Sequence, residues 1–537
     1  MRWTGIRARE GAIPESPGAV EAPPVGGGTP ARHLLVPALA ALLAGAAAGC
    51  SRPPTVKPAR IEISAPYAIS SLDPHEREWL DSFAIASHFY EGLVAIDREM
   101  AVRPGLALSW KNPDPLTWDF QLDPRARFHS GKPLRAEDVV FTIQRLQRDR
   151  EKLEVSVYVQ QIASVRALAP DRVEIRTSAP AGLLLNKLAW IAIVPKDAGD
   201  LRQHEDGTGP YRLARFLPGQ SVEMVRNETY AGRRPALAQV AFRLGRDDDG
   251  ALADFETGRC QLAFSNAPRA EEVVARAPGA RFERRASLFV EMLGFDATRA
   301  ESPFVSLRPN PFRNPSVREA VSLAIDRRAL VASLTSRPEP AWQLVSPAVF
   351  GFDPSLVPEV PDLARARKLL EEAGYPRGFE VTLHTRTILG ETAARVRDAL
   401  ARVGIRVTVE ALDAPSYFAL ATGRRPTLFL TRGICATGDA TELFEGAFHT
   451  PDPSRTLGSA NDGGLSDPEL DSRIERAGSL MSPAERIGTL RELMTRVTAA
   501  RFLLPLVVDV DHYLLQKGFA WKPRADSCIL AQEIGLE

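Results

Sequence analysis

The pattern of residues 379–410 limits the folds open to this chain more than any other feature of the sequence. Residues 379–385 alternate as a strand does, residues 391–403 have the apolar spacing of a helix that ends at Gly404, and residues 405–410 alternate again. A helix between two strands of one sheet returns the chain to a parallel neighbour through a right-handed crossover. The C-terminal half is therefore predicted to contain an open α/β sheet.

Two helices are predicted ahead of this unit. Asn314 precedes Pro315, which is the order of an N-cap followed by proline at the first helical position. A second helical pattern begins at Asp362 and stops at Gly374, since glycine readily takes the left-handed conformation that ends a helix. The N-terminal half is more mixed, with short alternating segments that predict strands.

The strand ends of the predicted α/β unit carry two arginines, Arg386 and Arg432. Ligands of open α/β sheets bind at the carboxyl ends of the strands. A guanidinium group is a planar fork that matches a carboxylate, so both arginines are candidates for recognising a charged ligand. The alternative, two arginines on a solvated surface, stays open for each of them.

An apolar run at residues 34–49 leads through small residues into Cys50. The run is shorter than the roughly 20 residues of a membrane-spanning helix, and it resembles a bacterial lipoprotein signal peptide. We expect Cys50 to be the lipidation site, residues 1–50 to be a disordered N-terminus plus the signal, and residues 51–57 to be a tether. The alternative is an ordinary buried helix.

The rest of the chain has the composition of a large protein with balanced charge. It has 67 basic and 67 acidic residues, which gives no electrostatic argument for binding nucleic acid. Its length allows two or three lobes. Cys260, Cys435 and Cys528 are far apart and lack the spacing of metal ligands, so we expect no metal site. One disulfide is possible, and at least one thiol is then left over.

Several short motifs occur in a fixed order along residues 58–520. They are Leu72-Asp73-Pro74-His75, Tyr90-Glu91-Gly92-Leu93-Val94, Phe128-His129-Ser130-Gly131-Lys132-Pro133-Leu134, Gly207-Thr208-Gly209-Pro210-Tyr211 and Ala324-Ile325-Asp326-Arg327. Together they resemble the family 5 solute-binding proteins of bacterial ABC importers, which take up peptides, dipeptides or nickel.

This resemblance implies a two-lobed periplasmic-binding-protein clamp of the large peptide-binding type, of α/β class with an additional smaller domain. Lobe I is expected to comprise residues 58–89, 206–300 and 502–537. The extra domain, inserted in lobe I, is expected at residues 90–205, and lobe II at residues 301–501. Residues 289–295 and 503–508 are expected to cross between the lobes.

The resemblance also suggests where a ligand binds. Peptide-binding members receive the ligand's ammonium group on an aspartate that follows a tryptophan near the end of a lobe II strand. The tryptophan is missing here, and Asp439 is the only acid in the matching segment, where it fits after a shift or gap. With Arg386 or Arg432 it would select a zwitterion such as a short peptide. Ser70, Ser71 and Phe289 are further candidates for residues that line the wall of the ligand-binding cleft.

The predicted function is that of a lipid-anchored, monomeric binding protein on the periplasmic or extracytoplasmic face of a membrane. It would deliver its solute to an ABC permease, a heterodimer or homodimer driven by cytoplasmic ATPases, without a cofactor. The same clamp could instead bind a metal chelate or another solute, or serve as a sensor or chaperone. An exported hydrolase is a weaker alternative, because the sequence lacks a Gly-x-Ser-x-Gly elbow and a His-Glu-x-x-His pair. We therefore expect no enzymatic activity.

Overall fold

The structure is a computed structural model, and it describes residues 59–77 and 80–537. The predictions for residues 1–50, for Cys50 and for the tether at residues 51–57 fall outside the described residues. Among the residues that are described, no helix is both long enough and apolar enough to cross a membrane.

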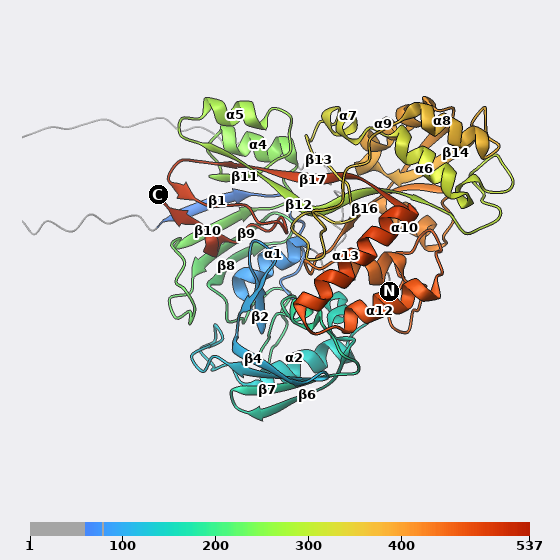
Figure 1. The fold of residues 1–537 in the computed structure, drawn as a ribbon. Helices are drawn as coiled ribbons and strands as arrows, with labels where there is room; N and C mark the ends of the chain where they lie inside the picture. The colour runs from blue at the N-terminus through green and yellow to red at the C-terminus, as the bar shows by residue number, and fades with distance from the viewer. Residues whose placement is uncertain (1–58, 78–79) are drawn as a thin grey trace, which may run out of the picture.

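In the described part of the chain, one 11-stranded mixed sheet runs through the whole molecule. Two long antiparallel strands, β12 (Arg281–Phe295) and β17 (Leu503–Leu515), lie in its middle. Figure 1 shows both crossing between the two halves of the protein. The strands on the lobe II side are β16 (Leu428–Ile434), β14 (Glu380–Arg386), β15 (Arg406–Leu412) and β13 (Glu339–Pro340). Those on the lobe I side are β11 (Leu262–Phe264), β1 (Arg60–Ser64), β10 (Gln239–Arg243), β9 (Ser221–Arg226) and β8 (Tyr211–Leu217).

The predicted crossover in lobe II is confirmed. Strands β14 and β15 pair in parallel, and α9 (Gly390–Ala401) connects them. Gly404 ends this connection with φ of +90°, a conformation that glycine adopts without a steric penalty. The other helices of this lobe are α6 (Pro315–Ala324), α7 (Arg327–Ala332), α8 (Leu363–Glu372), α10 (Ala414–Thr422), α11 (Thr441–Leu443), α12 (Pro468–Ser479) and α13 (Pro483–Ala500).

The predicted helix starts in lobe II are confirmed as well. The Asn314 side chain accepts a hydrogen bond from the Ser316 N–H at the start of α6, and Asp362 accepts one from the Arg365 N–H at the start of α8. These caps satisfy backbone donors that the first helical turn leaves without a partner. The buried faces of α6, α8 and α9 pack on the sheet in one apolar cluster.

Lobe I is built on the other side of the crossing strands. Strand β1 lies between β10 and β11 and pairs in parallel with both. Helices α4 (Asp248–Glu256) and α5 (Ala270–Arg276) pack together over this part of the sheet (Figure 1). Three further elements lie outside the large sheet. They are helix α1 (Leu80–Phe89), the antiparallel pair of β2 (Val94–Ile96) with β3 (Val102–Pro104), and the antiparallel pair of β18 (Phe519–Ala520) with β19 (Gly535–Leu536).

A second, separate sheet occupies part of residues 90–205. Its four antiparallel strands are β4 (Ala107–Asp114), β5 (Thr117–Leu122), β7 (Arg172–Thr177) and β6 (Ile162–Ala169), in this spatial order. Helix α2 (Ala136–Arg148) packs on it, and α3 (Leu184–Leu188) follows. Figure 1 shows this sheet below the large one, on the side of α1, α12 and α13.

The Leu72-Asp73-Pro74-His75 motif ties lobe I to this second sheet. Arg145 of α2 donates from Nη2 to the Asp73 carboxylate at 2.5 Å and also contacts His75 Nδ1. His75 Nε2 donates to the Ala192 carbonyl at 2.7 Å. Burial, helped by Arg145, lowers the pKa of His75 to about 4, so the ring is neutral and can accept at Nδ1 while it donates at Nε2. The motif is therefore structural.

The three cysteines of the described chain, Cys260, Cys435 and Cys528, are all buried free thiols. Burial raises the pKa of each, which keeps the thiols protonated and unreactive. The sequence left open whether two of these cysteines form a disulfide, and in the structure they do not.

Candidate ligand-binding site

Phe289 and Arg432 meet where the crossing strand β12 pairs with β16. The Arg432 guanidinium carbon lies 3.6 Å from the centroid of the Phe289 ring, and its Nε donates to Asp509 Oδ2 of β17 at 2.5 Å. Stacking on the ring and pairing with the carboxylate hold the guanidinium plane in one orientation. Residues on three strands thus hold the Arg432 guanidinium group in a fixed position next to the strands that cross between the lobes.

Arg386 stands at the end of β14, in the same part of the sheet. Its guanidinium carbon lies 5.7 Å from the ring centroid of Phe418 on α10. The residue is 8% exposed, so its charge is largely removed from water. Burial of this kind strengthens any charged hydrogen bond that a guanidinium makes.

A third group, Glu291 on β12, lies opposite Arg432 in the pairing of β12 with β16 and interacts with both arginines. The pKa of Glu291 is raised to about 8. Burial is the main cause and the charge of Asp509 adds to it, while Thr392, Arg432 and Arg386 act in the opposite direction. Its Oε2 atom has no hydrogen-bond partner among the described residues. An unsatisfied oxygen of this kind is unfavourable unless something else binds it.

Asp511 adds a further buried acid on β17. It is 3% exposed, and Tyr513 donates to its Oδ2 at 3.2 Å. Burial raises the pKa of Asp511 to about 6. We call the set formed by these residues the arginine–acid cluster: Glu291, Arg386, Arg432, Asp509 and Asp511, with the rings of Phe289 and Phe418.

The structure gives Asp439 a different partner from the one predicted. Asp439 is 2% exposed, and its Oδ2 accepts a hydrogen bond from Arg486 Nη2 of α13 at 2.5 Å. Its Oδ1 accepts from the Thr441 N–H at 2.9 Å. Both carboxylate oxygens are thus engaged inside the protein, and the predicted ammonium contact has no support in this geometry. Arg486 was not predicted as a partner, since it lies 47 residues further along the chain.

Ser70 and Ser71 lie in the loop that follows β1. Ser71 Oγ accepts a hydrogen bond from the Asp73 N–H at 3.2 Å, and the next residue, Leu72, donates from its N–H to the Arg202 carbonyl at 2.9 Å. These contacts place the two serines beside the extra domain. Of the six predicted ligand-binding residues, the structure brings together Phe289, Arg386 and Arg432.

Glu291 and Asp509 were missed in the sequence, although a signal was present. Each is a single acid inside an otherwise apolar strand, at residues 289–293 and 506–510. Acidic residues are almost never fully buried unless they are paired, so a charge at a core position of a strand suggests a functional group.

A groove of about 690 Å³ lies between the extra domain and lobe II. Asn186 of the extra domain donates to the Thr437 carbonyl at 2.8 Å, and the Gly182 N–H donates to the Gly478 carbonyl at 2.9 Å. Arg486, the partner of Asp439, donates to the Gly182 carbonyl at 3.2 Å. The Asp439–Arg486 pair therefore helps to join lobe II to the extra domain.

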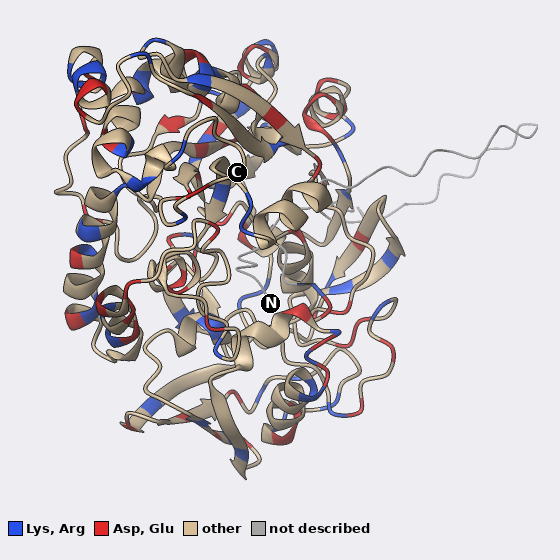
Figure 2. Ribbon diagram, turned by 90° about the vertical axis from the view of Figure 1, so that its right-hand side faces the viewer, with Lys and Arg blue, Asp and Glu red and all other residues tan. Residues whose placement is uncertain are grey.

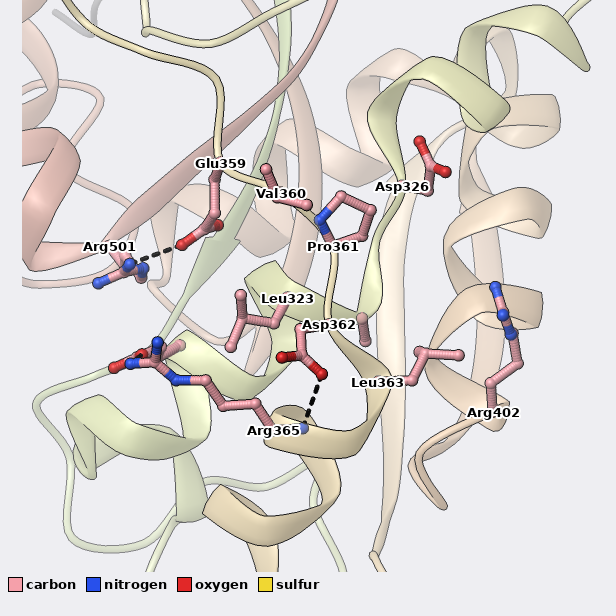
Figure 3. Close-up of a pocket in the computed structure, with 12 residues that line it drawn as sticks. Leu323, Asp326, Glu359, Val360, Pro361, Asp362, Leu363, Arg365, Arg402 and Arg501 are labelled. Carbon is pink, nitrogen blue, oxygen red and sulfur yellow. Dashed lines mark hydrogen bonds and ion pairs between the residues drawn. The ribbon is translucent and has the colours of Figure 1, made fainter.

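Another hollow, of about 740 Å³, lies on lobe II. Figure 3 shows two of its acids bonded within the protein, Glu359 to Arg501 and Asp362 to the backbone of Arg365. Charged residues of both signs are also interspersed over the rest of the molecule (Figure 2). Among the described residues, no group of three or more His, Cys, Asp or Glu side chains could hold a metal ion.

Residues 101–454 match the sequence profile of the bacterial extracellular solute-binding proteins, family 5 (middle region). The chain belongs to this family. The predicted family and the predicted two-lobed α/β clamp are confirmed. The chain is a solute-binding protein and not an enzyme.

Among similar proteins, the glutathione-binding protein GsiB of Salmonella typhi is 27% identical over 492 residues, which cover 88% of this chain and 93% of the relative. DppA of Helicobacter pylori, solved in complex with the peptide STSA, is 20% identical with a TM-score of 0.73, and the match covers 89% of this chain and 98% of that one. NikA of Brucella suis, solved with Fe(III)-EDTA, is 21% identical with a TM-score of 0.77, covering 89% and 100%. At these identities the two structures show a shared fold.

Proposed function

We propose that this protein is the extracytoplasmic substrate-binding lipoprotein of an ABC importer, and that it captures a short peptide or a related zwitterionic solute between its lobes. The observation that carries this proposal is the arginine–acid cluster. It places two guanidinium groups that contact aromatic rings, on β14 and β16, near carboxyl groups on the crossing strands β12 and β17.

In this proposal the ligand's carboxylate binds to Arg386 and Arg432. A guanidinium fork donates two parallel hydrogen bonds to a carboxylate, and stacking on Phe418 or Phe289 reduces the entropy lost when the ligand arrives. The ligands named for the similar proteins, glutathione, the peptide STSA and EDTA, all carry carboxylates. A metal chelate therefore remains the alternative cargo of the same two arginines.

Ligand binding would favour the closed clamp, because only the closed form lets the solute contact both lobes. A micromolar dissociation constant corresponds to about 8 kcal/mol, which is enough to drive a closure that costs a few. We propose that the closed, monomeric protein then delivers the solute to a permease dimer with cytoplasmic ATPases. The same closure would serve a sensor or a chaperone.

Ligand binding can be tested on the protein with Cys50 replaced by Ser, so that it is purified without lipid. Reduced glutathione, di-, tri- and tetra-alanine and Fe(III)-EDTA are the probes, read by melting temperature and by small-angle scattering. We expect a peptide probe to raise the melting temperature and compact the protein, and mass spectrometry to recover it intact. A response to Fe(III)-EDTA alone would favour the chelate, and no response to any probe would contradict the proposal.

The role of the arginines is tested with Arg386→Met and Arg432→Met, which keep much of the side-chain volume but remove the charge. The control is Arg395→Met on α9, since Arg395 is 43% exposed and its ion pair with Glu391 spans 3.9 Å. We expect the two cluster variants to bind the peptide probe more weakly and the control to bind it normally. Equal binding by all three variants would remove the arginines from the site.

The lipid anchor is tested separately in a bacterial host. We propose that the mature protein begins at a diacylated Cys50, because two acyl chains hold a protein stably on a membrane whereas one does not. Metabolic labelling with radioactive palmitate should label the wild type, and Cys50→Ser should lose the label and leave the membrane fraction. Labelling of the Cys50→Ser protein would contradict the assignment.

A further inference from the structure

Glu291 lies in an irregular part of the crossing strand β12. The ladder between β12 and β17 is irregular on both sides of it, between Ala286 and Val290 and again between Glu291 and Met292. Irregularities of this kind are common near functional sites, because an extra residue turns a side chain away from the regular face of the sheet. The irregular backbone therefore gives the Glu291 side chain a direction that it would not have in a regular strand.

Charged groups of both signs surround Glu291. Asp509 approaches from β17, Arg432 from β16, Arg386 from β14 and the Thr392 hydroxyl from α9. The nearer of these charges are already matched to each other, because Asp509 accepts the hydrogen bond of Arg432 Nε. With Asp511, two acids face two guanidinium groups, so an ionised Glu291 has no further counter-charge within the cluster. The ammonium group of a ligand would supply one.

The oxygen that could receive such a charge is Oε2 of Glu291, which is buried and has no hydrogen-bond partner in the described part of the chain. The predicted acceptor, Asp439, has both oxygens engaged by Arg486 and the Thr441 N–H. We propose that Glu291 receives the ammonium group of the bound solute, while Arg386 and Arg432 receive its carboxylate. This assignment rests on the proposed function, since it needs a zwitterionic ligand.

The assignment implies that binding releases a proton. Without ligand, burial keeps the Glu291 carboxyl protonated at neutral pH, since its pKa is raised to about 8. An arriving ammonium group keeps its own protons, and the Glu291 carboxyl loses its proton to solvent to form the ion pair. A zwitterion should therefore bind about tenfold more tightly for each unit of pH between 6 and 7.

The competing explanation is structural. A protonated Glu291 could simply donate a hydrogen bond that holds the irregular strand in place. In that case Gln would replace it well, ligand affinity would not depend on this residue, and no proton would leave on binding. The two explanations thus differ in a quantity that calorimetry measures.

The experiment is isothermal titration calorimetry at pH 7 in phosphate and in Tris, whose heats of ionisation differ, so that the protons released per ligand can be counted. The probes are trialanine and reduced glutathione, with N-acetyl-trialanine as the matched ligand without an ammonium group. The proteins are the Cys50→Ser form, its Glu291→Gln and Glu291→Asp variants, and Glu283→Gln as control. Glu283 lies on the same strand, but it is engaged by Arg281 and Lys522.

We expect the Cys50→Ser form and the Glu283→Gln control to release a net of about 0.8 proton per trialanine at pH 7. About 0.9 proton leaves a group with a pKa of about 8, and about 0.1 is taken up by the α-amino group of the peptide. Glu291→Gln should show no net release of protons and bind about 30-fold more weakly or worse, as expected when one partner of a buried charged pair is lost. Glu291→Asp should still release a proton, which separates the loss of charge from misfolding. N-acetyl-trialanine should bind all four proteins with similarly low affinity.

Two results would overturn the assignment. If trialanine or glutathione binds the Cys50→Ser form without releasing a proton, or binds Glu291→Gln equally well, Glu291 is structural while the proposed function stands. If none of the probes binds, the proposed function fails, and the role of Glu291 as an ammonium acceptor fails with it.

Discussion

Replacing Glu291 by Gln should change how the stability of the ligand-free protein depends on pH. The ordinary pKa of a glutamate, which applies to the unfolded chain, is 4.5, and burial raises the pKa to about 8 in the folded protein. A group whose protonated form is favoured by folding contributes its full stability below pH 4.5. That contribution is lost as the pH rises toward 8, because the unfolded chain releases the proton first.

The size of the effect follows from the two pKa values. Each pH unit between them lowers the free energy of unfolding by about 1.36 kcal/mol. Between pH 5 and pH 8 the wild type should therefore lose roughly 3 to 4 kcal/mol relative to Glu291→Gln, which does not titrate in this range. The Thr392 hydroxyl and the two arginines act in the opposite direction and are already included in the shifted pKa.

The assay is urea unfolding of the wild type, Glu291→Gln and Glu283→Gln at pH 5, 6, 7 and 8. The informative quantity is the difference between wild type and variant at each pH, since the other buried acids, such as Asp511, titrate in both proteins and cancel. The free energy of unfolding of Glu291→Gln should rise relative to that of the wild type at each step in pH, and that of Glu283→Gln should not. A difference that stays constant from pH 5 to pH 8, or that falls, would refute the buried and protonated state of Glu291.

Three further substitutions test the packing and the ion pairs. Asp439→Asn leaves the buried Arg486 without its counter-charge and should lower the free energy of unfolding by about 3–5 kcal/mol; a loss under 1 kcal/mol in urea would show that the pair is unimportant. Arg524→Met removes a 1% exposed guanidinium that binds two acids, and should cost a similar amount; an unchanged unfolding midpoint would contradict its role. Gly207→Ala would place a Cβ atom 1.9 Å from the Phe89 carbonyl oxygen and should cost about 1–3 kcal/mol, whereas Gly199→Ala, with no atom within 4 Å, should be nearly neutral in the same thermal melt. Equal melting temperatures for the two alanine variants would contradict the close approach at Gly207.

Much of lobe II could be predicted from the sequence because its signals are local. The N-caps at Asn314 and Asp362 and the glycine at position 404 act on neighbouring backbone groups, so the residues that fix these boundaries are close in sequence. The hydrophobic period and the lengths of these segments then predict that β14 and β15 pair in parallel, since a helical crossover connects parallel strands.

The site could be predicted only in part. Arg386 and Arg432 were predicted as ligand-binding residues because they follow strands whose ends meet at one edge of a sheet, and the structure places both near Glu291. Glu291 was not predicted, because its surroundings come from three other strands and a helix. The partner of Asp439 could not be predicted for the same reason, since Arg486 lies on α13, in a distant part of the chain.

The sequence by itself determined which segments become helices and strands, and its ordered motifs determined the family. Periodicity, caps and turn residues depend on neighbours along the chain, so they can be read before folding. Only the tertiary structure decided which charges are matched inside the protein and which oxygen remains without a partner. Burial and pairing depend on groups brought together from distant parts of the chain, and they determine the pKa of Glu291 as well as the engagement of Asp439.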